Sequence, residues 1–304
     1  MTTRSFMSSG DLAADRRFDY ARDLQASGDL VAAADLLRQA IERAPDFASA
    51  WFALGDISEQ LNQHGDAIAA FREAVRTDSS DRHGASLRLM RLGAIPLAAM
   101  PQDYVATLFD QYADRFEQSL VGELSYRGPA ILFEAVNAVC NPMRFAHAID
   151  LGCGTGLGAR AFAGCVDSFI GVDLAPQMVT KARTTGLYTS VIVADMIAGL
   201  RAQQGASFDL VLAADAAVYL ADIAPLADQA ARVLQSNGLL AFTVETHAGD
   251  DVVLGRGLRY AHSGDHVRDA LAKTGLTMLR LDSLSARNED GVAVPGLVVV
   301  AIKR

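Results

Sequence analysis

The chain has 304 residues, of which 51% are hydrophobic, and its net charge is −9; this is enough apolar material for two folded domains. The charge is spread along the chain without a basic stretch, so we expect no nucleic-acid partner. No apolar run reaches the roughly 18 residues of a membrane span, the polar first residues lack a signal-peptide core, and the three cysteines have no metal-ligand or disulfide spacing. We therefore expect a cytoplasmic protein with no membrane contact and no metal site.

The N-terminal third contains a sequence repeat. Trp51, Leu54 and Gly55, followed by Ala67 and Phe71, have the spacing of a tetratricopeptide repeat of about 34 residues. A matching set stands one period earlier: Tyr20, Ala21, Gly28, Ala33, Leu37, Ala40 and Pro45. We predict an all-α repeat domain over residues 1–100 with a capping helix at 82–92, and we expect this array to dock on the rest of the chain. Recruitment of a protein partner and self-association through the repeats both stay open.

Pro96 and Pro101 mark the junction to a second domain, which we predict over residues 101–304. Shortly after the junction, Phe109, Tyr112 and Phe116 fall at i, i+3 and i+7, a spacing that places them on one face of a helix. Such a stripe is either core or a surface that covers a ligand.

A glycine-rich turn follows the apolar run at 145–149. Asp150 begins it, and Gly152, Gly154 and Gly156 alternate through it before a helix-like segment. Glycine suits this place because the chain turns tightly between strand and helix and lets a ligand approach the main chain closely. The free backbone N–H groups of the following helix then face that ligand.

The turn can be aligned with two different cofactor motifs. Gly154, Gly156 and Ala159 fit the dinucleotide pattern G-x-G-x-x-G/A, with Asp173 at the position of the ribose-binding acid. In the other alignment the strand ends at Asp150, whose carboxylate can accept hydrogen bonds from a cationic amino-acid headgroup. S-adenosylmethionine has such a headgroup and a dinucleotide does not.

The following segments favour the second alignment. Three further apolar runs, at 168–172, 191–194 and 208–213, are each followed by an acid: Asp173, Asp195 and Asp215. In an open parallel sheet, ligands bind at the carboxyl ends of the strands, where these acids would lie. Asp173 is placed to accept from ribose hydroxyls and Asp195 from an adenine amino group, while Met196 packs on the ring.

With Asp150 and its glycines, Asp173, Asp195-Met196 and a fifth strand at 238–246, residues 101–304 resemble the class I S-adenosylmethionine-dependent methyltransferases. The resemblance implies an α/β fold with a Rossmann-like sheet of seven strands, including 276–284 and an antiparallel last strand at 297–303. It implies S-adenosylmethionine as cofactor and S-adenosylhomocysteine as product. Phe109 to Phe116, Arg259 to Ser263 and Val294 to Gly296 are similar to a bacterial subgroup that fuses this domain to tetratricopeptide repeats.

The resemblance also implies a set of site residues. Those expected at the cofactor are Tyr112, Tyr126, Asp150, Gly152, Cys153, Gly154, Gly156, Asp173, Leu174, Met178, Asp195, Met196 and Ala214. Those expected at the methyl acceptor are Tyr219, Glu245 and Arg259, and the candidates for catalysis are Asp215, Tyr260 and His262. We expect a small-molecule acceptor; a protein acceptor and a non-catalytic interaction protein are the alternatives.

The segment after the fifth strand is predicted to be a glycine-containing loop that closes over the acceptor. In it, Arg259 would pair with an acceptor carboxylate or phosphate, and His262 would orient or deprotonate the acceptor. His262 and His266 are four residues apart, which is a possible metal spacing. Ser263 is better explained as the N-cap of a helix that contains His266, so no metal is predicted.

Overall fold

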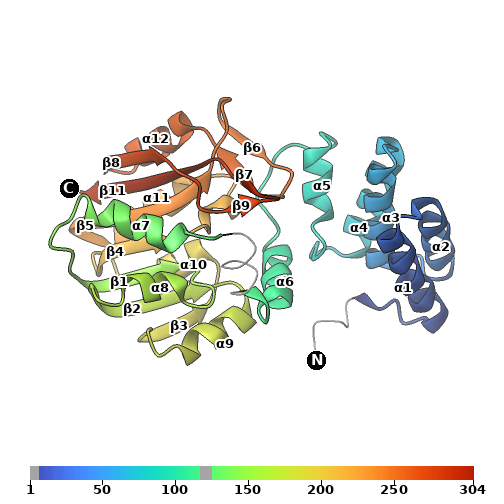
Figure 1. Cartoon of the computed structure of the whole chain (residues 1–304), viewed down its shortest axis with the longest axis horizontal. Coiled ribbons are helices and arrows are strands. Elements are labelled where there is room, and N and C mark those ends of the chain that lie inside the picture. The colour runs from blue at the N-terminus through green and yellow to red at the C-terminus, as the bar shows by residue number, and fades with distance from the viewer. Residues whose placement is uncertain (1–6, 117–124) are drawn as a thin grey trace. The chain divides into compact units, whose positions relative to one another are not determined.

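The computed structural model of the protein describes residues 7–116 and 125–304 (Figure 1). The chain divides into two compact units, Met1–Thr107 and Leu108–Arg304; the sequence boundary between residues 100 and 101 stays a prediction. Within the described ranges, none of the helices combines the length and the apolar character that crossing a membrane requires.

The first unit consists of helix pairs. Its helices are α1 (Leu12–Ser27), α2 (Leu30–Arg43), α3 (Ala48–Gln60), α4 (His64–Thr77) and the shorter α5 (Ala85–Arg91). Asp11 and Asp29 cap the first two helices by accepting hydrogen bonds from backbone N–H groups, as expected for Asp at this position. Helix α6 (Gln102–Tyr112) follows and leads into the second unit.

Gly55 of α3 is required by the close approach of α4. A Cβ atom added at Gly55 would lie 2.6 Å from the Phe71 ring, and Phe71 is fully buried. Only a residue without a side chain therefore lets these two helices pack as they do.

We expect Gly55→Ala to lower the free energy of unfolding of the repeat unit by about 1–2 kcal/mol, because overpacking outweighs the helix-propensity gain. Gly65→Ala, in α4, is the matched control. No atom lies within 4 Å of a Cβ added at Gly65, so urea unfolding of that variant should match or slightly exceed the wild type. Equal destabilisation of both variants would contradict this account.

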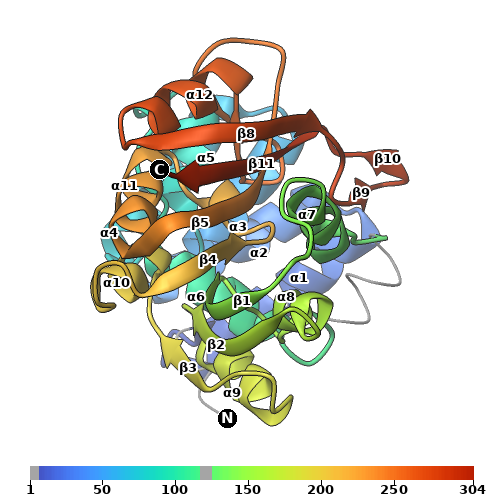
Figure 2. The same ribbon diagram turned by 90° about the vertical axis from the view of Figure 1, so that its left-hand side faces the viewer.

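The second unit is built on one sheet. Figure 2 shows its strands in the order β3 (Ser190–Val193), β2 (Val166–Asp173), β1 (Phe145–Leu151), β4 (Phe208–Ala213), β5 (Leu234–Glu245), β11 (Gly296–Lys303) and β8 (Leu276–Ser283). The pairs from β3 to β5 are parallel, and β11 is antiparallel to both of its neighbours. This order confirms the predicted Rossmann-like sheet with its antiparallel last strand.

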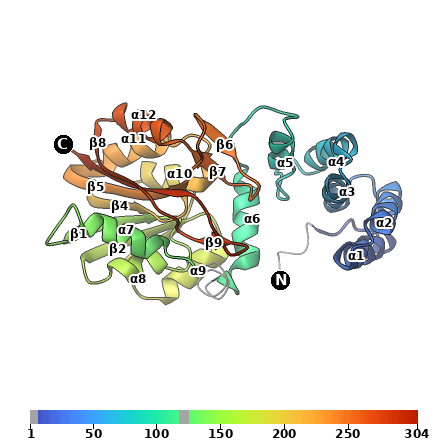
Figure 3. The same ribbon diagram turned by 45° about the horizontal axis from the view of Figure 1, so that its top comes forward.

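Helices cover both faces of the sheet (Figure 3). One face packs on α10 (Met196–Arg201), α11 (Ala224–Val233) and α12 (Gly264–Ala272), and the other on α7 (Gly128–Asn137) and α8 (Leu157–Phe162). Helix α9 (Pro176–Thr184) lies beside β2 and β3. Since both faces of the sheet are buried, its central strands are continuous apolar runs, and such runs can be recognised in the sequence.

The segment after β5 differs from the predicted loop. It contains β6 (Val252–Leu254) and β7 (Tyr260–His262), and β7 pairs in parallel with the end of β5 through Ala261 and Glu245. A further hairpin, β9 (Asn288–Glu289) with β10 (Val292–Ala293), lies between β8 and β11. The loop prediction for residues 260–262 was therefore wrong, since strand pairing orders this segment.

Candidate functional site

The glycine turn joins β1 to α8 in the conformation that only glycine adopts readily. Gly152, Gly154 and Gly156 have φ angles of +65°, +53° and +98°. At Gly152 the turn also passes close to the end of β4, since an added Cβ would lie 2.5 Å from the Cβ of Ala216. A side chain at Gly152 would therefore be excluded both by its backbone angles and by its neighbour.

Asp150 lies at the end of β1, only 2% exposed. Its Oδ2 accepts a hydrogen bond of 2.7 Å from the hydroxyl of Tyr188, a partner that sequence analysis missed. Burial raises the pKa of Asp150 to about 6, and the bond from Tyr188 opposes this rise. Asp150 is thus a buried carboxyl group at the glycine turn, bonded to Tyr188.

Asp173 ends β2 and connects two backbone segments. Its Oδ2 accepts from the N–H of Gly154 at 2.8 Å, and its Oδ1 accepts from the N–H of Ala175 at 2.9 Å. Asp173 is 8% exposed, and burial raises the pKa of its carboxyl. The acid therefore fixes the glycine turn in place while lying at the strand end where a ligand is expected.

Asp195 follows β3 and is the N-cap of α10. Its Oδ1 accepts from the N–H groups of Ile197 and Ala198 at 2.9 and 3.0 Å. Capping is therefore an established role of this acid. The carboxylate is half-buried at the carboxyl end of its strand, so a second role at the ligand edge is compatible with the first.

Thr155, inside the glycine turn, tests whether the turn fits a bound ligand. The residue is 4% exposed, and its Oγ1 has no hydrogen-bond partner among the residues that the structure describes. A buried hydroxyl without a partner costs stability unless a water or ligand satisfies it. The residues of the turn therefore fit a polar cofactor that approaches the backbone here.

The other residues expected at the cofactor lie in different environments. Met178 is fully buried in a small core with Ala113 and Ala175, and Cys153 is 4% exposed. Leu174 and Met196 are half-buried. Tyr112 is 46% exposed at the end of α6, although it was predicted to share a face with the partly buried Phe109 and Phe116.

A charge cluster lies beyond β4 and β5 and is called the edge cluster below. Its members come from the ends of β4 and β5, from the loop before β7 and from the start of the β9–β10 hairpin: Asp215, Glu245, Arg259, Arg287 and Glu289. Sequence analysis proposed Asp215 for catalysis and Glu245 and Arg259 for the acceptor, and the structure brings the three together. It missed Arg287 and Glu289.

Arg287 is the centre of the edge cluster. It is 4% exposed, and its Nη1 donates to both carboxylate oxygens of Asp215, at 2.5 and 2.6 Å. Its Nη2 donates to Glu245, and its Nε lies 3.3 Å from a carboxylate oxygen of Glu289. Arg259 joins the same acids, since its Nε donates to Glu245 at 2.6 Å and its Nη2 pairs with Glu289.

Asp215 has an unusual backbone as well as charged partners. Its φ of +55° is in the left-handed region, and its N–H donates to Thr243 of β5 at 2.8 Å. Left-handed residues other than glycine are concentrated at functional sites. Burial raises the pKa of the Asp215 carboxyl, and Arg287 opposes this effect by stabilising the carboxylate.

Aromatic side chains surround this end of the sheet. Tyr219 makes an edge-to-face contact with Phe109, with ring centroids 5.4 Å apart. The hydroxyl of Tyr126 donates to the carbonyl oxygen of Ala214 at 3.4 Å. Both tyrosines were predicted at the site. Tyr219 lies near Arg259 of the edge cluster, and Tyr126 contacts the residue that follows β4.

His262 and Tyr260 are fully buried in β7. The Nε2 of His262 donates to the carbonyl oxygen of Leu220 at 3.0 Å, and its ring lies 5.3 Å from that of His266. Burial, together with the neighbouring His266, lowers the pKa of His262 to about 4. His262 is thus held neutral, as a structural group between β7 and the segment after β4.

The buried His262 predicts a loss of stability in acid. His262 binds a proton near pH 6.5 in the unfolded chain and only near pH 4 in the folded chain. Its contribution to the free energy of unfolding is therefore complete above pH 6.5 and decreases as the pH falls towards 4. When the pH is lowered from about 7 to about 4.5, the free energy of unfolding should fall in both proteins. The fall should be about 2–3 kcal/mol smaller in His262→Gln than in the wild type. Parallel pH profiles of urea unfolding for the two proteins would contradict this assignment.

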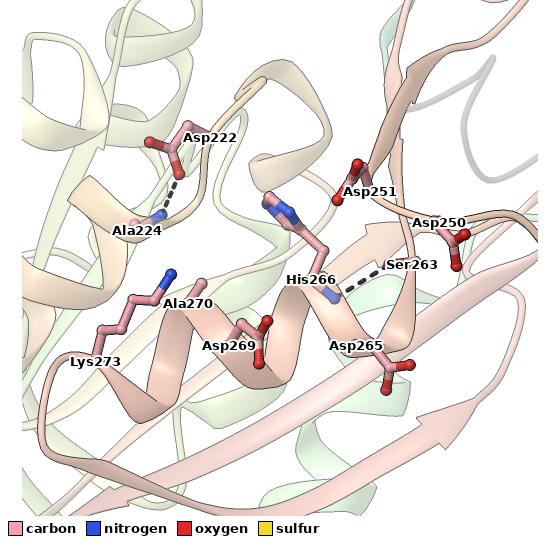
Figure 4. A pocket seen from close by; sticks show the side chains of 10 residues that line it. All are labelled: Asp222, Ala224, Asp250, Asp251, Ser263, Asp265, His266, Asp269, Ala270 and Lys273. Carbon is pink, nitrogen blue, oxygen red and sulfur yellow. Dashed lines mark hydrogen bonds between the residues drawn. The ribbon is translucent and has the colours of Figure 1, made fainter.

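A separate pocket of about 410 Å³ lies between the start of α12 and neighbouring loops (Figure 4). Acidic side chains dominate its lining, which consists of Asp222, Ala224, Asp250, Asp251, Ser263, Asp265, His266, Asp269, Ala270 and Lys273. Ser263 caps α12 by accepting from the N–H of His266 at 3.1 Å, as predicted. Across residues 7–116 and 125–304, no three His, Cys, Asp or Glu side chains are grouped so that they could hold a metal ion.

Comparison with known sequences finds a family match in each part of the chain. The family described as "Methyltransferase domain" matches residues 149–242, and the family described as "Tetratricopeptide repeat" matches residues 18–82. The ubiquinone biosynthesis O-methyltransferase of Xylella fastidiosa (strain 9a5c) is 30% identical over 137 residues, which are 42% of this chain and 56% of that protein. The protein of the same name from Xanthomonas oryzae pv. oryzae (strain PXO99A) is 34% identical over 98 residues, 31% of this chain and 41% of its own length. The chain thus matches only about half of the length of these relatives.

Solved structures share the fold at low identity. The Burkholderia thailandensis 1,6-didemethyltoxoflavin-N1-methyltransferase, crystallised with bound 1,6-didemethyltoxoflavin and S-adenosylhomocysteine, has a TM-score of 0.53 at 18% identity, and the match covers 69% of this chain and 92% of that one. The [4+2]-cyclase SpnF has a TM-score of 0.55 at 17% identity, with 69% and 98% covered. Since a cyclase shares the architecture, fold similarity alone does not identify the reaction.

Proposed function

We propose that this chain, a class I S-adenosylmethionine-dependent methyltransferase domain fused to N-terminal tetratricopeptide repeats, transfers a methyl group to a small-molecule acceptor. The observation that carries the proposal is the glycine turn of β1, held by Asp173 and containing the unsatisfied hydroxyl of Thr155. It lies at the carboxyl edge of a parallel sheet, where such folds bind ligands.

The cofactor would be held by groups from three neighbouring strand ends. In this proposal Asp150 accepts from the amino group of the methionine part, Asp173 from the ribose hydroxyls and Asp195 from the adenine. The backbone of the glycine turn completes the cradle. Asp173 and Asp195 keep their structural bonds, because each carboxylate has further lone pairs for a ligand.

When bound, S-adenosylmethionine supplies a methyl group that its sulfonium already activates for displacement. The protein then has to orient the nucleophilic atom of the acceptor in line with that methyl group and to exclude water. The edge cluster and the aromatic rings of Tyr219 and Phe109 are suited to orientation. Asp215, whose pKa is raised by burial, is suited to accept a proton from an acceptor that must lose one.

We assign no proton transfer to His262 or Tyr260. Both side chains are fully buried, and the Nε2 of His262 is bonded to the Leu220 carbonyl. A group that takes a proton from the acceptor must come within hydrogen-bond reach of it. His262 would therefore act by holding β7 to the segment after β4, and the acceptor would meet Asp215 and Glu245 instead.

The experiment that tests the function follows a labelled methyl group. The purified chain is incubated with S-adenosylmethionine labelled in its methyl group and with a cell extract separated into small molecules and proteins. Label in the small-molecule fraction, lost with Asp173→Ala, is the expected result. Label confined to proteins would favour a protein methyltransferase whose repeats recruit the substrate, and label in neither fraction would reject both.

A further inference from the structure

The edge cluster has more negative than positive groups. Three carboxylates, those of Asp215, Glu245 and Glu289, face the guanidinium groups of Arg259 and Arg287. Arg287 contacts all three acids, and Arg259 contacts Glu245 and Glu289. Both arginines are therefore committed to carboxylates of the protein.

An anionic acceptor would have to displace one of these pairs. Arg259 was expected to bind an acceptor carboxylate or phosphate, and its side chain is 19% exposed in contact with Glu245, whose side chain is 15% exposed. Removing one partner from a desolvated ion pair leaves the other charge buried and unpaired, which is strongly unfavourable. The cluster therefore opposes an anion at this edge.

A cationic acceptor meets no such cost. Glu289 has the most exposed carboxylate of the cluster, with 39% of its side chain accessible, so it can accept a hydrogen bond from an ammonium group without losing Arg259. Tyr219 provides a second attraction, because it interacts with Arg259 of the cluster and makes an edge-to-face contact with Phe109, and aromatic rings attract cations near their faces. Carboxylates in excess beside aromatic rings are a suitable environment for a protonated amine.

We infer that the acceptor is a small molecule with a protonated amine, and that Glu289 and the Tyr219–Phe109 pair select it by charge. This inference rests on the proposed function, because it assigns the substrate class of the same site. It also assigns a role to the β9–β10 hairpin, which carries Glu289 to the edge cluster. The hairpin start is fixed by the N–H of Arg127, which donates to the carbonyl of Ala286 at 2.7 Å.

Three probes of one size test the charge preference. Benzylamine, benzyl alcohol and benzoate share a ring and differ in charge, and their binding to the full chain saturated with S-adenosylhomocysteine is measured by ligand-observed NMR titration. We expect benzylamine to bind about tenfold more tightly than benzoate, with benzyl alcohol between them. Glu289→Gln should reduce the ratio of amine to benzoate affinity several-fold, because it removes the excess carboxylate.

Asp265→Asn is the matched control. It removes the same charge from the acidic pocket near α12, on a side chain that is 89% exposed, so the amine preference at the edge cluster should not change. If Asp265→Asn abolishes the preference and Glu289→Gln does not, the amine binds in the acidic pocket and the inference is overturned. Equal or tighter binding of benzoate, or no binding of any probe, also overturns it.

The affinity for S-adenosylhomocysteine, measured on the same samples, separates this inference from the proposed function. If S-adenosylhomocysteine binds and the amine preference is missing, the acceptor class is wrong and the methyltransferase proposal stands. If S-adenosylhomocysteine itself does not bind, the proposed function fails and the inference fails with it.

Discussion

Replacing Asp173 by Ala is expected to weaken the binding of S-adenosylhomocysteine roughly ten- to hundredfold, because a charge-assisted acceptor for the ribose hydroxyls is lost. The structure adds a second effect. Asp173 accepts from the N–H groups of Gly154 and Ala175 and is buried, so the ligand-free variant should also unfold at a lower temperature. Calorimetry gives the affinity, and a thermal unfolding scan gives the stability.

Asp209→Ala separates these two effects. Asp209 also accepts from two backbone N–H groups, those of Ala146 and His147, at 2.7 and 3.0 Å. It lies near the start of β4, away from the carboxyl ends of the strands. The control should therefore lose stability while keeping its affinity for S-adenosylhomocysteine. If both variants lose the same affinity, the effect of Asp173→Ala is structural and the ribose assignment is wrong.

Replacing Arg287 by Met is expected to lower the free energy of unfolding of the second unit by about 3–5 kcal/mol. The substitution removes the cation that contacts Asp215, Glu245 and Glu289 and leaves the first two carboxylates without it, at side-chain exposures of only 17% and 15%. Arg287→Lys keeps the charge but not the forked geometry, so its loss should be intermediate. Urea unfolding of the three proteins measures these differences.

Arg280→Met provides the comparison on the same stretch of chain. Arg280 pairs with Asp282, and both side chains are about one-third exposed, at 34% and 32%. Solvent-exposed pairs of this kind contribute about 0–1 kcal/mol. A loss for Arg287→Met no larger than that for Arg280→Met would show that the edge cluster does not depend on its central arginine.

The cofactor half of the site could be predicted because each of its acids follows its own strand. Asp150, Asp173 and Asp195 are found by locating an apolar run and reading the next residue, and parallel strands then bring them to one edge. The glycine turn adds a local signal, since its residues need left-handed backbone angles. The capping bonds of Asp195 depend only on neighbours in sequence.

The acceptor half could not be predicted to the same depth because its contacts join distant parts of the chain. Arg287 lies 72 residues from Asp215 and 42 from Glu245, and no motif marks the hairpin that carries Glu289. His262 was expected on an open loop because glycines precede it. Pairing of β7 with β5 through a single residue pair, Ala261 with Glu245, buries it instead, and a three-residue strand gives no periodic signal.

The most direct test of this account is calorimetric titration of the full chain with S-adenosylhomocysteine and, separately, with NAD. The alignment of the glycine turn in which the strand ends at Asp150 predicts saturable binding of S-adenosylhomocysteine at one site and no binding of NAD. Asp173→Ala should weaken the binding of S-adenosylhomocysteine. Preferential binding of NAD, or the absence of any heat of binding with S-adenosylhomocysteine, would contradict the account at its centre.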